Sequence, residues 1–140
     1  MIEWRTLLDL VIAYLLAIPA GFERERYERS AGLRTFPLVA VASAGFVLIA
    51  QRAGPPEAQA RVIQGLIGGI GFIAGGAILR GKFGVHGTAT AASILATGAT
   101  AVAVAYRSYD VAVVLSAMSY ITLRLFERWK QMQDREDQRP

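Results

Sequence analysis

The chain has no cysteine and only one histidine among its 140 residues. The absence of cysteine excludes a disulfide framework, a thiol nucleophile and a thiolate metal site. A single histidine excludes a zinc site built from a histidine cluster and argues against a Ser-His-Asp triad. The acidic residues also lack the spacing of a dedicated Mg²⁺ site. We therefore expect no catalytic residue of these kinds, no metal site and no cofactor.

Charge is also scarce, because charged residues make up 19% of the chain and hydrophobic residues 54%. The charges gather at the ends of apolar segments, a distribution typical of membrane helix bundles. The net charge is +4, but the Arg and Lys residues flank apolar segments, where they act as topology signals. We therefore expect a lipid bilayer, and not a nucleic acid, as the surroundings of this chain.

Glycine is concentrated in one apolar run, residues 62–79. Six of the 14 glycines fall there: Gly65, Gly68, Gly69, Gly71, Gly75 and Gly76. Within lipid, small residues at this spacing let two helices approach closely. A glycine-rich phosphate loop is the alternative, but it needs a preceding strand and a following acidic residue, which this run lacks. We predict that the glycines form a helix-packing face, which serves either a homodimer or neighbouring helices of the same chain.

Five apolar segments are candidates for membrane-spanning helices: residues 7–22, 36–50, 62–79, 88–105 and 111–126. They predict an all-α fold, a polytopic membrane helical bundle of about five transmembrane helices. Residues 80–87 are expected to form a tight loop between the third and fourth helices. The predicted transmembrane domain covers residues 1–126, and a hydrophilic cytoplasmic tail covers residues 127–140.

The basic residues predict the orientation of these five spans. Eleven of the 15 Lys and Arg residues fall on the side that holds residues 23–35, residues 80–87 and the tail. Because basic residues are enriched in cytoplasmic loops, we expect this side in the cytoplasm and the N-terminus outside.

A mixed-charge segment, residues 23–35, follows the first predicted span. A helical hairpin would bring the end of the first span near the starts of the second and fourth spans. The free N–H groups at these helix starts stabilise nearby carboxylates. Thr35 is a candidate cap for the second helix, and Thr88 or Thr90 for the fourth. We predict a polar network at this cytoplasmic mouth, with Glu23, Glu25 and Arg34 at its centre. Its candidate members are Glu23, Arg24, Glu25, Gly32, Arg34, Thr35, Arg80, Thr88 and Thr90. The alternative is a set of solvated charges.

Two acidic residues lie near the outer ends of predicted spans, Asp9 in the first and Asp110 in the fifth. An intramembrane acid is a candidate for ion or proton transport. The alternative is that both side chains extend to water. Asp9 is the stronger candidate because it lies within the apolar segment.

Two motifs carry a family resemblance. Gly21-Phe22-Glu23-Arg24-Glu25, followed by residues 31–35 (AGLRT), resembles a signature of the MgtC/SapB family of bacterial inner-membrane proteins. Residues 69–80 (GIGFIAGGAILR) and 87–92 (GTATAA) are similar to two further motifs of the family in the same order. The chain departs from the family pattern at Ala89, where threonine is usual, at Leu95, where tryptophan is common, and at Pro19. It resembles a short form of the family or its N-terminal membrane domain.

The resemblance implies a multi-pass protein of the bacterial inner membrane without enzymatic activity. It also implies a link to magnesium limitation, to virulence in some pathogens, and to regulation of membrane proteins such as the F-type ATP synthase. A small transporter or channel for magnesium or another cation is the alternative. The regulatory role is favoured because the deep parts of the second, third and fourth spans hold no charged residue.

Overall fold

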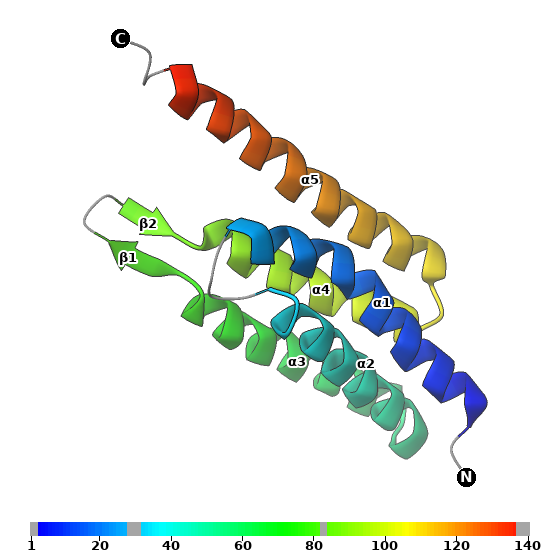
Figure 1. Ribbon diagram of the computed structural model, residues 1–140. Coiled ribbons are helices and arrows are strands. Elements are labelled where there is room, and N and C mark those ends of the chain that lie inside the picture. The colour runs from blue at the N-terminus through cyan, green and yellow to red at the C-terminus, as the bar shows by residue number, and fades with distance from the viewer. Residues whose placement is uncertain (1–2, 28–31, 82–83, 137–140) are drawn as a thin grey trace.

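Five α-helices and one short β-hairpin make up the fold in the computed structural model, which describes residues 3–27, 32–81 and 84–136 (Figure 1). The elements are α1 (Trp4–Tyr27), α2 (Thr35–Ala53), α3 (Pro56–Gly76), β1 (Leu79–Gly81), β2 (Gly84–His86), α4 (Thr88–Ala105) and α5 (Tyr109–Glu136). The predicted helical bundle is therefore confirmed.

Helix α4 is the centre of the bundle, because it packs against all four other helices. Its sequence is almost entirely small, with Ala, Gly, Ser and Thr at most positions. Small side chains let several helix backbones approach one axis closely. Only a few larger residues of α4, including Ile94 and Val104, are fully buried among these neighbours. The small residues of α4 therefore determine how tightly the bundle closes.

Helices α3 and α5 lie at opposite edges of this arrangement (Figure 1). Helix α3 packs against α2 and α4, whereas α5 packs against α1 and α4. The attachment of α3 is narrow, because Ile70 and Ala74 are its only buried residues. Most of the α3 surface is therefore open to the surroundings of the bundle.

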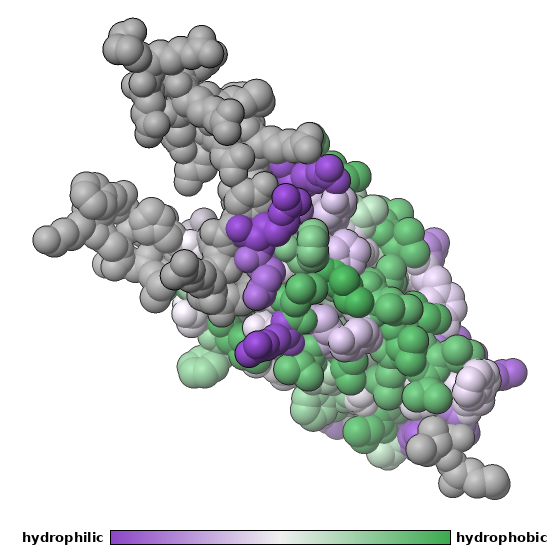
Figure 2. Space-filling model, viewed as in Figure 1, coloured by the Kyte–Doolittle hydropathy of each residue, from purple (hydrophilic) through white to green (hydrophobic). Residues whose placement is uncertain are grey.

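Three helices, α1, α2 and α4, are long and apolar enough to cross a membrane among the residues described. The third predicted span, residues 62–79, is displaced, because α3 begins at Pro56 and ends at Gly76. The shift brings Glu57 and Arg61 into α3 and takes Leu79 into the hairpin. That α3 and α5 also cross the membrane remains a prediction. On the face shown in Figure 2, apolar residues cover most of the middle of the bundle and hydrophilic residues gather toward its two ends.

The connection between α3 and α4 is not the simple loop that we expected for residues 80–87. Strands β1 and β2 form an antiparallel hairpin in which Leu79 pairs with His86 and Gly81 with Gly84. Helix α5 continues to Glu136, into the segment predicted as a tail. The hairpin and the end of α5 lie at the opposite end of the bundle from the N-terminus (Figure 1). The inside-outside orientation remains a prediction.

Candidate functional site

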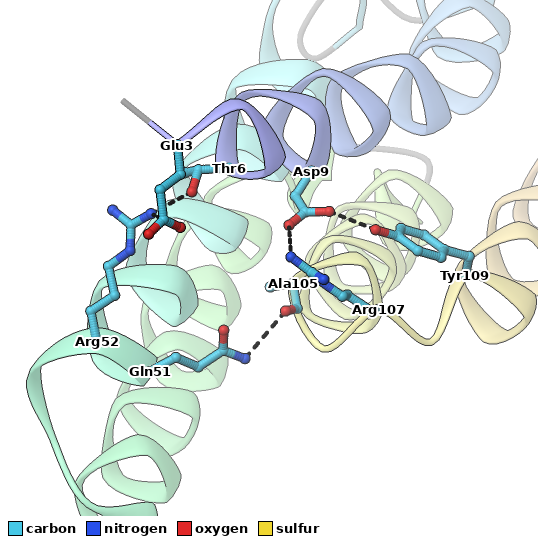
Figure 3. Close-up of polar contacts among 8 residues, drawn as sticks. All are labelled: Glu3, Thr6, Asp9, Gln51, Arg52, Ala105, Arg107 and Tyr109. Atoms are coloured by element: carbon cyan, nitrogen blue, oxygen red, sulfur yellow. Dashed lines mark hydrogen bonds and ion pairs between the residues drawn. The ribbon is translucent and has the colours of Figure 1, made fainter. Parts of the chain in front are cut away.

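A polar cluster joins the beginnings of α1 and α5 and is called here the Asp9 cluster. Asp9 is 2% exposed. Its Oδ1 atom accepts a hydrogen bond of 2.6 Å from the hydroxyl of Tyr109, and its Oδ2 atom lies 3.8 Å from Nη2 of Arg107 (Figure 3). A buried carboxylate is costly unless it is hydrogen-bonded and paired. Both requirements are met here, so the cluster fixes α5 against α1.

The turn between α4 and α5 places Arg107 at this carboxylate. Arg107 has φ 59°, the only positive φ of a non-glycine residue among those described. Such a conformation is uncommon for a residue with a Cβ atom. The Arg107 side chain is 51% exposed, so water screens its attraction to Asp9. Asp9 is therefore held mainly by the hydroxyl of Tyr109, with Arg107 as a partly solvated counter-ion.

Tyr109 lies at the first residue of α5, outside the apolar segment that follows it. The hydrogen bond to Asp9 raises the pKa of the Tyr109 hydroxyl above its ordinary value, and burial and the charge of Asp9 add to the effect. The positive charge of Arg107 opposes it. The hydroxyl therefore remains a proton donor to Asp9 throughout the physiological pH range.

Two further contacts stabilise the same end of the bundle (Figure 3). Arg52, near the end of α2, donates hydrogen bonds to Glu3 and Thr6 at the start of α1. The amide of Gln51 donates a hydrogen bond of 3.2 Å to the carbonyl oxygen of Ala105. Arg52 and Glu3 are largely exposed, so we expect their ion pair to contribute little to stability. These contacts align the helix ends rather than form a cavity.

At the opposite end of the bundle, Arg24 connects α1 to the start of α4. Arg24 is 1% exposed, and its Nη1 atom donates a hydrogen bond of 3.3 Å to the hydroxyl of Thr90, which is fully buried. The neighbouring Glu23 is 3% exposed. The structure thus brings three of the predicted mouth residues into the interior of the bundle.

Glu25 and Gly32 form a separate contact at this end. The Oε2 atom of Glu25 accepts a hydrogen bond of 3.1 Å from the backbone N–H of Leu33. A Cβ atom on Gly32 would collide with the Glu25 side chain. Glycine is therefore required here for the close approach between the end of α1 and the start of α2. The contact thus joins the two halves of the first motif, which are separated in the sequence.

The structure also describes three other residues predicted at the mouth, Arg34, Thr35 and Thr88. The Arg34 side chain is exposed and forms no hydrogen bond or ion pair within the described residues. The expected threonine caps are not found, because Arg34 and Gly87 occupy the N-cap positions of α2 and α4 without a side-chain hydrogen bond. Thr35 and Thr88 are instead the first residues of their helices. The side chain of Arg80 lies outside the described residues.

Buried hydroxyl groups follow α4 toward the other end of the bundle. Ser93, Thr97 and Thr100 donate hydrogen bonds to the carbonyl oxygens of Thr90, Ser93 and Ala96, all within α4. Side-chain hydroxyls in helices commonly bond in this way to the preceding turn. These groups are satisfied by their own helix, so they do not present a ready-made lining for an ion. No group of three or more His, Asp or Glu side chains within the described segments could hold a metal ion.

The six glycines predicted as a packing face point a hypothetical side chain into open space. A Cβ atom added at Gly65, Gly68, Gly69, Gly71, Gly75 or Gly76 would meet no atom within 4 Å. By contrast, a Cβ atom on Gly98 of α4 would collide with Ile70 of α3. The close approach of α3 to α4 therefore uses the glycine of α4, and neighbouring helices of the same chain do not explain the glycines of α3.

Two apolar grooves flank α3. The first, about 350 Å³, lies between α2 and α3 and includes Ala42, Phe46 and Gly69 in its lining. The second, about 460 Å³, lies between α3 and α4 and includes Ile67, Leu95 and Ala99. Both are open hollows rather than enclosed cavities. The edge position of α3 thus leaves room for apolar groups on either side of it.

Sequence reasoning did not identify Tyr109 and Arg107 as the partners of Asp9. These residues are about a hundred positions from Asp9, and only the packing of α5 against α1 brings them together. The only indication in the sequence was the predicted topology, which places the starts of the first and fifth spans on the same side of the membrane.

Comparison with known proteins identifies the family. Residues 10–132 match the model of the MgtC family. The chain is 40% identical over 90 residues to protein MgtC of Brucella abortus, covering 64% of this chain and 38% of that protein. It is 32% identical over 133 residues to protein SrpB of Synechococcus elongatus, covering 85% of this chain and 73% of that protein.

An uncharacterized protein of Synechocystis is 39% identical over 98 residues, which cover 69% of this chain and 42% of the relative. The chain thus spans less than half the length of some of the relatives it matches. No solved structure shows a significant match. The family match covers most of the chain and all five helices, so the chain belongs to the MgtC family.

Proposed function

We propose that this protein acts in the bacterial inner membrane by packing against other membrane proteins and regulating them, without catalysing a reaction. The observation that supports this proposal is the position of α3 at the edge of the bundle, which leaves an apolar groove on each side of the helix. A transmembrane segment of a partner fits such a groove by van der Waals contact, which drives helix association in lipid. We further propose that this regulation belongs to adaptation to low magnesium, as the family suggests, and to virulence in members from pathogens.

A small cation transporter is the second candidate, and Asp9 is the observation that favours it. A transport role would require the carboxylate to exchange its partners for a cation or a proton. In this structure, Tyr109 and Arg107 already neutralise and hold the Asp9 carboxylate. The hydroxyl groups along α4 are bonded to their own helix. These contacts support regulation through packing over transport.

A flux measurement separates the two candidates. We expect purified protein in liposomes loaded with a magnesium-sensitive dye to show no uptake above empty vesicles. Saturable uptake that is lost in Asp9→Asn would overturn the proposal in favour of transport. A known magnesium channel reconstituted in parallel verifies that the vesicles can report flux.

A substitution that fills a groove tests the packing role directly. Ala42→Leu fills part of the α2–α3 groove, and Ala99→Leu fills part of the α3–α4 groove. Both alanines are exposed, so the bundle should fold normally. Ala117→Leu on the exposed face of α5 is the matched control.

In cells that depend on this protein for growth at low magnesium, we expect the groove variants to fail and the α5 control to grow. Cross-linking from position 46 or 67 to the F-type ATP synthase, lost in the groove variants, would identify that enzyme as the partner. Normal growth of both groove variants at wild-type protein levels would contradict regulation through these grooves.

A further inference from the structure

The groove between α3 and α4, about 460 Å³ in volume, receives residues from three helices. One face of α4 lines it along its length, where Leu95, Ala99 and Val102 follow one another at helical spacing. Ile63 and Ile67 line it from α3, and Val111 lines it from the start of α5. An apolar group in this groove therefore touches three helices at once.

The groove extends through only about half of the membrane. Its lining on α4 runs from Leu95 to Tyr106, a distance of about 16 Å at 1.5 Å per residue. The hydrocarbon layer is about 30 Å thick, so one leaflet accounts for about 15 Å. No residue of α4 before Leu95 belongs to the lining. A transmembrane helix of another protein crosses both leaflets, whereas the acyl chain of a lipid occupies one.

Two large side chains mark the inner end of the groove. Ile70 of α3 packs on Gly98 so closely that an added Cβ atom on Gly98 would collide with it. Leu95 lies nearly one helical turn deeper on α4, and both residues belong to the lining. An apolar chain that enters from the Tyr106 end therefore stops near the middle of the membrane, where the acyl chain of a lipid also ends.

The other end of the groove reaches the polar turn between α4 and α5. Tyr106 and Ser108 line this end. The Tyr106 hydroxyl donates a hydrogen bond of 3.3 Å to Gln59, whereas the Ser108 hydroxyl has no hydrogen-bond partner among the described residues. Arg107 lies between them in the chain, with its side chain 51% exposed. An unused hydroxyl donor and a positive charge thus lie at the level of the lipid headgroups.

We propose that the α3–α4 groove binds one phospholipid, with an acyl chain along α4 and the phosphate and ester groups beside Ser108. Contact with three helices holds this chain more strongly than contact with one open helix face, because van der Waals attractions add up. The Ser108 hydroxyl donates to an ester or phosphate oxygen, and Arg107 attracts the phosphate. Asp110 is exposed on the first turn of α5, so this end carries both signs and does not select an anionic headgroup.

This inference rests on the proposed packing role and refines it. The α2–α3 groove is left to a segment of the partner protein, and a lipid fills the α3–α4 groove on the other side of α3. Ala42→Leu then affects growth by blocking the partner, and Ala99→Leu affects growth by expelling the lipid.

Native mass spectrometry of the full chain tests the lipid site. The protein is extracted with detergent from vesicles of phosphatidylethanolamine and phosphatidylglycerol and then washed. We expect one phospholipid per 15.1 kDa chain, with either headgroup. Ala99→Leu and Ser108→Ala should retain several-fold less lipid, and Ala117→Leu, on the exposed face of α5, as much as wild type. No retained lipid, or equal retention by Ala99→Leu at an unchanged melting temperature, would overturn the proposal.

A phospholipid with a photoreactive group at the end of its acyl chain locates the site. In vesicles that contain it, we expect labelling to concentrate on Leu95, at the inner end of the groove. Val114 and Met118 on α5 are the control positions, and both are more exposed than Leu95. Labelling in proportion to exposure would show that the groove holds no particular lipid, and the proposal would fail.

Neither measurement depends on growth or on magnesium. Failure of the lipid site therefore leaves the partner proposal standing, whereas normal growth of Ala42→Leu cells bears on the partner contact alone.

Discussion

The hydroxyl of Tyr109 and the carboxylate of Asp9 are joined by a hydrogen bond of 2.6 Å across a separation of 100 residues. Hydrogen bonds to charged groups contribute about 1.5–3 kcal/mol, and Tyr109 is 38% exposed, so we expect the lower end of this range. Tyr109→Phe should lower the free energy of unfolding in detergent by about that amount. Tyr14→Phe on an exposed face of α1 is the control and should be neutral. Equal stability of the two variants would mean that the contact contributes nothing.

The same contact predicts a dependence on alkaline pH. The pKa of Tyr109 is raised in the folded protein above its ordinary value of about 10. The stabilisation is therefore fully present below pH 10 and is lost as the pH rises through the folded pKa. Between pH 7 and 9, we expect no difference attributable to Tyr109. Above pH 10, the stability gap between wild type and Tyr109→Phe should close, and a gap that stays constant would contradict this.

Arg24 and Arg26 should respond very differently to the same substitution. Arg24 is buried and bonded to Thr90, whereas Arg26 is exposed and lies over the ring of Phe22 with 5.9 Å to its centroid. A hydrogen bond to a charged group contributes about 1.5–3 kcal/mol. We expect Arg24→Gln to lower the melting temperature strongly and Arg26→Gln to change it little. Similar melting temperatures would show that Arg24 is solvated in the membrane.

Gly87 begins the last family motif and has φ 85°. An added Cβ atom would also collide with the carbonyl oxygen of Ala77. A non-glycine residue in the left-handed conformation alone costs about 1–3 kcal/mol. Gly87→Ala should therefore destabilise the protein by more than this amount. Gly69→Ala, in open space within α3, should instead stabilise by up to about 1 kcal/mol. Thermal unfolding of the two variants should shift in opposite directions.

The orientation can be tested with reporter fusions. A fusion at Ala58, in the first turn of α3, and a fusion at the C-terminus should report opposite sides of the membrane. Equal signals from both positions would rule out the predicted five-span topology.

Periodicity and glycine content were sufficient to predict the helices, because long apolar runs leave few alternatives in lipid. They could not place the end of α3, since the apolar run continues through Leu79 although the chain turns into a hairpin. At the predicted mouth, Arg24 is bonded to Thr90 and the side chain of Arg34 is exposed. Charge order along the chain does not specify which of several neighbouring arginines points inward. That choice depends on the rotation of α1 against α4, which only packing determines.

The polar first half of α3 has a consequence for insertion into the membrane. Helix α3 carries Glu57, Gln59, Arg61 and Gln64 in its first half and does not qualify as a span alone, whereas α4 does. A translocation channel that tests segments one at a time would release α3 poorly into lipid. The short β-hairpin connects the end of α3 to the start of α4. We therefore expect α3 to enter the bilayer after α4 has emerged from the ribosome, as the second half of a pair whose insertion α4 drives.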